Sequence, residues 1–131
     1  MKLLKNLSLA LLLTVLLVGC SKNDDDNSAS LIGSWKITSQ KLNNVTLPLD
    51  ACELKSVITF DSKYITIKDY YGDDCENFDT EALPYTRNGN NLTVGIGEEM
   101  ETVKILTLSQ STLEIETRDE EFVLVQKYTR L

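Results

Sequence analysis

Apolar and polar residues alternate with a period of two along most of the chain after residue 31. Such alternation, bounded by Gly, Asn and Asp, predicts β-strands with one buried face. We expect eight short strands in this sequence. Their apolar positions are Trp35 and Ile37; Ile58 and Phe60; Ile65 and Ile67; Leu83 and Tyr85; Leu92, Val94 and Ile96; Val103 and Ile105; Leu113 and Ile115; and the run from Phe122 to Tyr128.

Three local features modify this pattern. Residues 50–54 allow a single helical turn, and Ile105-Leu106-Thr107-Leu108 breaks the alternation, which predicts a bulge or a strand end. Asn88-Gly89-Asn90 predicts a hairpin, because a type I′ turn needs positive φ at both central residues. The strands are therefore short and joined by tight connections.

The predicted fold class is all-β over residues 31–131, as a small eight-stranded antiparallel up-and-down barrel. Short strands with tight hairpins favour this architecture. Closure also removes the exposed strand edges that promote aggregation. An open sandwich of two sheets is the alternative.

The first nineteen residues have the organisation of a secretory signal peptide. Lys2 and Lys5 precede an apolar run over residues 7–18, and Gly19 is a small residue at the predicted cleavage point. The run has twelve residues, whereas a membrane-spanning helix needs about 20. A cleaved signal is therefore favoured over a single-pass anchor or a buried helix.

Leu17-Val18-Gly19-Cys20 resembles the lipobox of bacterial lipoproteins. The resemblance implies that a diacylglycerol is attached to the Cys20 thiol, that cleavage occurs just before Cys20, and that the new amine is acylated. Two or more acyl chains anchor a protein stably in a membrane, whereas one does not. We therefore expect a lipoprotein of the cell envelope, in the outer membrane.

Residues 20–30 contain no large apolar side chain, so we expect the lipidated cysteine to be followed by a disordered acidic tether. Lys22 followed by Asp24-Asp25-Asp26 resembles the export signal that sends some Gram-negative lipoproteins to the cell surface. The sequence therefore allows either the cell surface or the periplasmic face of the membrane as the protein's location. Without Lys2 and Lys5, 11 basic residues oppose 20 acidic ones, a net charge of −9 that disfavours nucleic acid.

Cys52 and Cys75 remain once Cys20 is assigned to lipid. An even pair in an exported domain predicts a disulfide. The bridge would close a loop of 24 residues and contribute about 3 kcal/mol. A redox or metal pair is the alternative, although the sequence has no Cys-x-x-Cys spacing and no histidine.

Candidate catalytic groups are few. The absence of histidine excludes Ser-His-Asp and Cys-His arrangements. The acidic clusters Asp73-Asp74-Glu76 and Glu98-Glu99-Glu101 fall in turn-rich polar stretches, where carboxylates are normally solvated. The loop Tyr70-Tyr71-Gly72-Asp73-Asp74 is a candidate for binding a sugar, a cationic ligand or Ca²⁺. Its Gly and Asp residues are also typical of an ordinary turn, which is the better interpretation. We predict no enzyme, no cofactor and no metal site.

Gly33-x-Trp35 in the first strand resembles the Gly-x-Trp motif of lipocalins, and Arg130 stands where that superfamily often places an arginine. The resemblance implies that Trp35 closes the barrel floor and that Arg130 stacks across it. Residues 31–131 resemble, more closely, the small lipocalin-like domains of bacterial lipoproteins, which share two mid-chain cysteines, an Asn-Gly hairpin and a closing Tyr-x-Arg. At 101 residues the domain is shorter than usual lipocalins and lacks their long C-terminal helix.

The predicted function is a non-enzymatic binding domain for a small apolar or amphipathic ligand held inside the barrel or at its mouth. The expected lining comes from inward positions of the strands, namely Ile37, Ile65, Ile67, Tyr85, Leu92, Val94, Val103, Ile115 and Leu124. The alternative is a protein-interaction or structural accessory with a filled barrel, for example an inhibitor of a basic secreted enzyme. A connected apolar cavity of about 300 Å³ or more would favour the ligand carrier.

Overall fold

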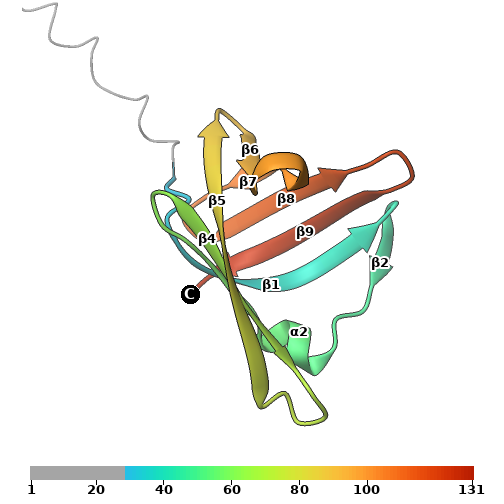
Figure 1. The fold of residues 1–131 in the computed structure, drawn as a ribbon. Coiled ribbons are helices and arrows are strands. Elements are labelled where there is room, and N and C mark those ends of the chain that lie inside the picture. The colour runs from blue at the N-terminus through green and yellow to red at the C-terminus, as the bar shows by residue number, and fades with distance from the viewer. Residues whose placement is uncertain (1–28) are drawn as a thin grey trace, which may run out of the picture.

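Antiparallel β-strands make up nearly all of the fold (Figure 1). The computed structural model describes residues 29–131, so the predicted signal peptide, Cys20 and most of the tether lie outside the described residues. Within residues 29–131 the strands are β1 (Gly33–Leu42), β2 (Val45–Leu47), β3 (Val57–Phe60), β4 (Tyr64–Tyr71), β5 (Asn77–Asn88), β6 (Asn91–Val94), β7 (Glu101–Leu108), β8 (Thr112–Arg118) and β9 (Val123–Arg130). A short helix, α2 (Ala51–Lys55), follows β2, and a 3₁₀ turn, η5 (Gly97–Glu99), precedes β7.

The sheet closes into a barrel because the first and last strands pair with each other. β1 pairs with β9 on one side, from Trp35↔Arg130 to Leu42↔Leu124, and with β3 on the other. Each strand from β3 to β9 pairs with the next, so eight strands form the closed ring and β2 is an additional strand on β1. The predicted eight-stranded antiparallel barrel is confirmed, and the sandwich alternative is wrong.

The additional strand β2 was not predicted, because residues 45–47 are too few to show a period. β2 pairs with the second half of β1, from Gln40↔Leu47 to Leu42↔Val45. The turn residues Asn43 and Asn44 have φ values of 51° and 69°. Positive φ at both central residues defines a type I′ turn, and asparagine tolerates that conformation better than most residues.

The hairpin predicted around Gly89 is present, but its turn differs from the expected one. Asn88 pairs with Asn91, so the two central residues are Gly89 and Asn90. Within this turn only Gly89 has positive φ, at 63°. Glycine at the first central position with positive φ there alone is typical of a type II′ turn. The type I′ turn therefore lies at residues 43–44 instead.

Two other strand ends also differ from the prediction. β5 begins at Asn77, six residues before Leu83, because this half pairs with β4 through its backbone while its side chains stay exposed. Ile96 lies outside β6 and is 70% exposed. Gly95 and Gly97 flank Ile96 with φ values of 108° and 65°. These conformations end the strand, since extended strands need negative φ.

Two irregularities bend the sheet. The pairing of β7 with β8 shifts register between Ile105 and Thr107, as the broken alternation predicts. A second shift, between Ile37 and Ser39, separates the two halves of β1 along β9. The predicted helical turn is α2, which begins after Asp50 with a capping box. Its Glu53 N–H donates to Asp50 Oδ1 at 2.8 Å, and Asp50 N–H donates to Glu53 Oε2 at 2.9 Å.

The core fills the first half of the barrel, where β1 begins. Trp35 and Leu113 are fully buried, and Leu92 is 1% exposed. The other buried members of the cluster are Leu31, Phe60, Ile65, Val103, Ile105, Ile115 and Tyr128. The Phe60 and Tyr85 rings meet edge to face at 5.4 Å between centroids, a favourable aromatic geometry.

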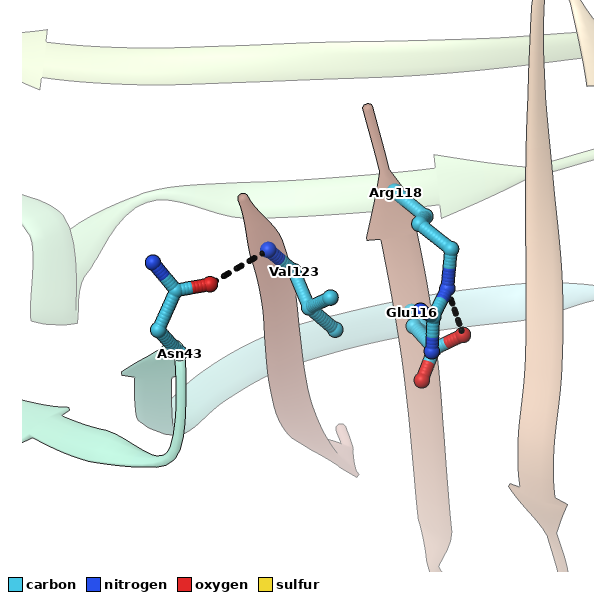
Figure 2. A network of polar contacts seen from close by, with 4 residues as sticks. All are labelled: Asn43, Glu116, Arg118 and Val123. Carbon is cyan, nitrogen blue, oxygen red and sulfur yellow. Dashed lines mark hydrogen bonds and ion pairs between the residues drawn. The ribbon is translucent and has the colours of Figure 1, made fainter. Parts of the chain in front are cut away.

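At the other end of β1, the β1–β2 turn is bonded to the start of β9. Asn43 Oδ1 accepts from the Val123 N–H at 2.9 Å (Figure 2). The Asn43 N–H also donates to the Val123 carbonyl at 2.9 Å. Nearby on β8, Arg118 Nε lies 3.3 Å from Glu116 Oε1, the one ion pair within residues 29–131. At this rim, hydrogen bonds of the backbone and of the Asn43 side-chain amide thus join β9 to the β1–β2 turn, whereas the ion pair lies within β8.

Candidate functional site: a pocket beneath helix α2

The closed end of the barrel is formed by three mutually dependent residues. The Arg130 guanidinium carbon lies 4.1 Å from the centroid of the Trp35 ring. Its Nη1 donates to the Ile32 carbonyl at 2.8 Å, its Nε to the Gln110 carbonyl at 2.7 Å, and its Nη2 to the Ser30 carbonyl. A Cβ at Gly33 would lie 2.6 Å from Arg130 Nη1, so glycine leaves the space that the guanidinium fills. The guanidinium is thus held over the indole face by three backbone carbonyls.

A gap in the sheet lies further along the barrel. β3 pairs with β1 only over residues 33–36, and β4 pairs with β3 only up to Lys68. Beyond these points β1 and the end of β4 are not bonded to each other. Helix α2 contacts both strands and lies between them in Figure 1. α2 therefore closes this gap with side chains instead of with a strand.

Three bonds hold α2 against the β4–β5 hairpin. Cys52 and Cys75 form the predicted disulfide, with 5.1 Å between their Cα atoms. Lys55 Nζ donates to the Cys75 carbonyl at 2.7 Å. Ser56 Oγ accepts from the Tyr70 N–H at 3.0 Å. The helix has only five residues, so these bonds position it more than its own hydrogen bonds do.

Beneath α2 lies a cavity of about 310 Å³. Its wall is formed by β1, β3, β4 and β9 together with α2 and the segment before it. The lining residues are Ile37, Gln40, Leu49, Glu53, Ser56, Val57, Ile58, Ile67, Asp69, Gln126 and Tyr128. The pocket thus combines aliphatic side chains with a small number of polar groups, as small-molecule sites commonly do.

Tyr128 is the most buried polar side chain of this pocket, at 8% exposure. Burial raises the pKa of its hydroxyl to about 12, and the negative charge of Asp69 adds to the rise. The hydroxyl forms no hydrogen bond to another residue within 29–131. Every fully enclosed polar side-chain atom among these residues has a partner, so the Tyr128 hydroxyl is not fully enclosed. It therefore faces the open space of the pocket. It is protonated at neutral pH, so it can donate one hydrogen bond to a bound molecule.

The structure divides the predicted lining residues into three sets. Ile37 and Ile67 line the pocket. Ile65, Leu92, Val103 and Ile115 are buried in the core, and Tyr85 and Val94 pack against it. Leu124 belongs to neither set, since it is half-buried opposite Leu42 and Thr117 near the rim. Much of the interior is therefore filled, and the pocket lies on the side toward α2.

None of the pocket's polar residues was in the lining predicted from the sequence. Asp69 follows Ile65 and Ile67 on the same face of β4. Extending the two-residue alternation by one more step would have assigned it to that face. Gln126 and Tyr128 follow Leu124 in the same way on β9. Glu53 and Leu49 carry no such signal, because only the packing of α2 brings them to the barrel.

The acidic clusters and the Tyr70–Asp74 loop lie at the surface, away from the pocket lining. The carboxylates of both clusters are exposed, and residues 72–75 form a turn in which the Cys75 N–H donates to the Gly72 carbonyl at 3.3 Å. Tyr70 lies on the outer face and contacts Phe78, with 5.5 Å between ring centroids. Within residues 29–131 no three metal-ligating side chains come together. Over the same residues, no helix is long and apolar enough to cross a membrane.

A second hollow lies on the outer face of the barrel, near the bonds shown in Figure 2. Its volume is about 390 Å³, and its lining comprises Asn43, Asn44, Glu116, Arg118, Val123 and Val125. The alternation along β8 and β9 points these side chains away from the core. It therefore lacks the apolar wall of the pocket beneath α2.

An up-and-down barrel of eight strands with an interior pocket defines a small binding-protein class. A family model describing the lipocalin-like domain matches residues 31–115. The chain belongs to this lipocalin-like family. No curated protein matches the sequence.

A solved bacterial structure shows the same fold. A lipocalin-like protein from Bacteroides uniformis ATCC 8492 superposes with a TM-score of 0.60 at 15% identity, covering 77% of this chain and 98% of that one. Bovine odorant-binding protein in complex with its natural ligand gives a TM-score of 0.44 at 15% identity, covering 85% of this chain and 75% of that one. At these identities the likeness to the bacterial protein concerns the fold.

Proposed function

We propose that this chain is a membrane-anchored lipoprotein whose barrel binds a small apolar or amphipathic ligand in the pocket beneath α2, without catalysing a reaction. The observation that carries the proposal is the cavity of about 310 Å³ between the barrel wall and α2. Ligand pockets in proteins begin at about 300 Å³. Side chains fill the core beside this pocket, whereas the pocket itself has room for a small ligand.

The pocket offers a guest apolar contact. Ile37, Ile58 and Ile67 pack against the core on one side and line the pocket on the other. Covering such surface contributes about 25 cal/mol per Å². At about 30 Å³ for each water-sized group, a cavity of about 310 Å³ accommodates a chain of about ten carbons.

A binding role without catalysis agrees with the side chains present. The sequence has no histidine, the residue that most often transfers protons in enzymes near neutral pH. The buried phenol of Tyr128, with a pKa of about 12, is a hydrogen-bond donor at neutral pH and a poor proton acceptor. The remaining polar lining consists of amides, a hydroxyl and two carboxylates.

The anchoring half of the proposal rests on the sequence outside the described residues. The basic start, the apolar run and the lipobox-like Leu17–Cys20 support export and lipidation at Cys20. The Cys52–Cys75 disulfide supports an oxidising compartment. We place the protein in the outer membrane, on the periplasmic or the surface face.

Binding can be tested by NMR titration of the soluble chain, residues 21–131, with 1-decanol as the probe. We expect shift changes at the amides of Ile37, Ile67 and Gln126. Leu49→Trp should abolish them, because Leu49 lines the pocket and the larger indole would occupy it. Leu54→Trp is the matched control, since Leu54 lies on α2 five residues after Leu49, is 45% exposed and is outside the lining.

Two results would contradict the proposed site. One is the absence of saturable shifts with decanol or any apolar probe of similar size. The other is equal binding by the Leu49→Trp and Leu54→Trp variants, which would place the probe elsewhere. Native mass spectrometry of protein purified from its own cells adds a direct readout, because a co-purifying small molecule would identify the natural ligand.

A further inference from the structure

The β4–β5 hairpin presents carboxylates on the inner side of the barrel wall. Ile65, Ile67 and Asp69 alternate on the inward face of β4. In the pairing with β5, Asp69 stands directly opposite Asp79, and Ile67 opposite Glu81. All three carboxylates are exposed and lie on the same face of the hairpin. Asp69 is the one that lines the pocket, at its solvent-facing edge.

This arrangement is unfavourable for the fold alone. Like charges directly opposite each other in an antiparallel pair are destabilising. Asp69 and Asp79 have no ion-pair partner within residues 29–131, where the one such pair is Glu116–Arg118. A cation bound beside Asp69 would relieve this repulsion.

The rest of the pocket has the same sign of charge. Glu53 on α2 lines the side opposite the β4 wall, and its Oε2 accepts only the Asp50 N–H among the described residues. The part of the lining that the structure describes includes two carboxylates and no lysine or arginine. A bound anion would meet repulsion here, and a bound cation would meet attraction.

The hydroxyl of the buried Tyr128 side chain adds a second and independent observation. It lines the same pocket as Asp69 and forms no hydrogen bond to another residue within 29–131. The hydroxyl is open to the pocket and not fully enclosed, so a molecule bound there can supply the hydrogen-bond partner that the chain does not. Hydroxyl oxygens accept bonds from ammonium groups. Tyr128 can therefore bond a cationic head that the carboxylates attract.

We propose that the ligand is an amphipathic organic cation, with an ammonium-type head among Asp69, Glu53 and the Tyr128 hydroxyl and an apolar body against Ile37, Ile58 and Ile67. The inference rests on the proposed function and names its ligand class. A metal ion fits less well, because no three ligating side chains come together among residues 29–131. The apolar wall also favours a head attached to a carbon chain.

The test compares three ten-carbon probes by NMR titration: decylamine, 1-decanol and decanoate. Asp69 and Glu53 are exposed, so each contributes only a modest attraction to a cationic head, and the two add. We therefore expect decylamine to bind about tenfold more tightly than decanol, and decanoate to bind most weakly. The preference should shrink as salt is raised, because salt screens charge.

Asp69→Asn is the decisive variant. It should lower the decylamine-to-decanol affinity ratio to about two- or threefold, while Tm stays equal or rises by a few degrees as the repulsion with Asp79 is removed. Asp73→Asn is the matched control, since it removes the same charge from an exposed turn outside the pocket. It should leave the ratio unchanged.

The outcomes separate this inference from the proposed function. If decanol and decylamine bind the pocket equally, or decanoate binds best, the cation inference is wrong and the apolar pocket stands. If no probe binds, both fail. A lower Tm in Asp69→Asn would assign Asp69 a structural role. An equal fall of the decylamine-to-decanol affinity ratio in Asp73→Asn would assign the effect to net charge. Either result overturns the inference.

Discussion

Single residues at the closed end of the barrel depend on one another more than their spacing suggests. Gly33 has a φ of 138°, a conformation that other residues rarely adopt. Its missing side chain leaves the volume that Arg130 fills, and Arg130 in turn covers the Trp35 ring. The Gly-x-Trp and arginine pattern is thus one physical unit, in which glycine makes the stacking of the other two possible.

Gly33→Ala should lower the free energy of unfolding by about 2–3 kcal/mol, because it combines backbone strain with displacement of the guanidinium. Gly89→Ala is the control, since Gly89 also has positive φ, at 63°, but a Cβ added there would have no atom within 4 Å. We expect about 1 kcal/mol at that position. Urea unfolding followed by Trp35 fluorescence measures both, and equal losses would show that crowding by Arg130 is unimportant.

At the level of elements, α2 substitutes for a strand. It is too short to be stable alone, and its position depends on the disulfide, on Lys55 and on Ser56. The pocket exists because a helix bridges β1 and β4 where direct strand pairing stops. Loosening α2 should therefore affect the pocket before it affects the barrel.

The double variant Cys52→Ser/Cys75→Ser should lose about 3 kcal/mol of stability, because the unfolded chain is no longer constrained by the bridge. We also expect decanol to bind several-fold more weakly, since α2 covers the pocket. Thermal unfolding with and without reductant provides the comparison. Reductant should lower the Tm of the parent chain and leave the variant unchanged, and a parent chain insensitive to full reduction would refute the expectation.

The elements differ in how well the sequence predicts them. Strands with one buried face, such as those of Trp35 and Ile115, follow from alternation alone. The first half of β5 does not, because side chains on both of its faces are exposed and only backbone bonds define it. β2 is short and depends on the turn at Asn43 and Asn44. Alternation of apolar and polar residues thus predicts strands that have a buried face. It does not predict strands that pair through the backbone while their side chains stay exposed.

The candidate site was predictable only in part, for a related reason. Ile37 and Ile67 could be assigned to the interior from their period. Which part of the interior stays open depends on the volumes of many packed side chains and on the placement of α2. Glu53 reaches the pocket through that placement, so no local pattern around it indicates a binding role.

For the whole molecule, the main prediction concerns the anchor. Expressed in a Gram-negative host and fed an alkyne-labelled fatty acid, the chain should incorporate label, and mature protein should begin at Cys20. Cys20→Ala should lose the label because the thiol is the acceptor. Protease treatment of intact cells then separates surface from periplasmic placement. Unlabelled protein that retains Met1 would contradict export and lipidation together.

The bonds from Arg130 to Ser30 and Ile32 have a consequence for orientation. They fix the point where the chain enters the barrel at the Trp35 end, whereas the pocket lies along β1 on both sides of the irregularity at residues 37–39. A lipid on Cys20 would therefore hold the domain by its Trp35 end. The flexible tether predicted over residues 20–30 would let the barrel turn on this attachment, so that the pocket could meet molecules from the bilayer as well as from the surrounding fluid.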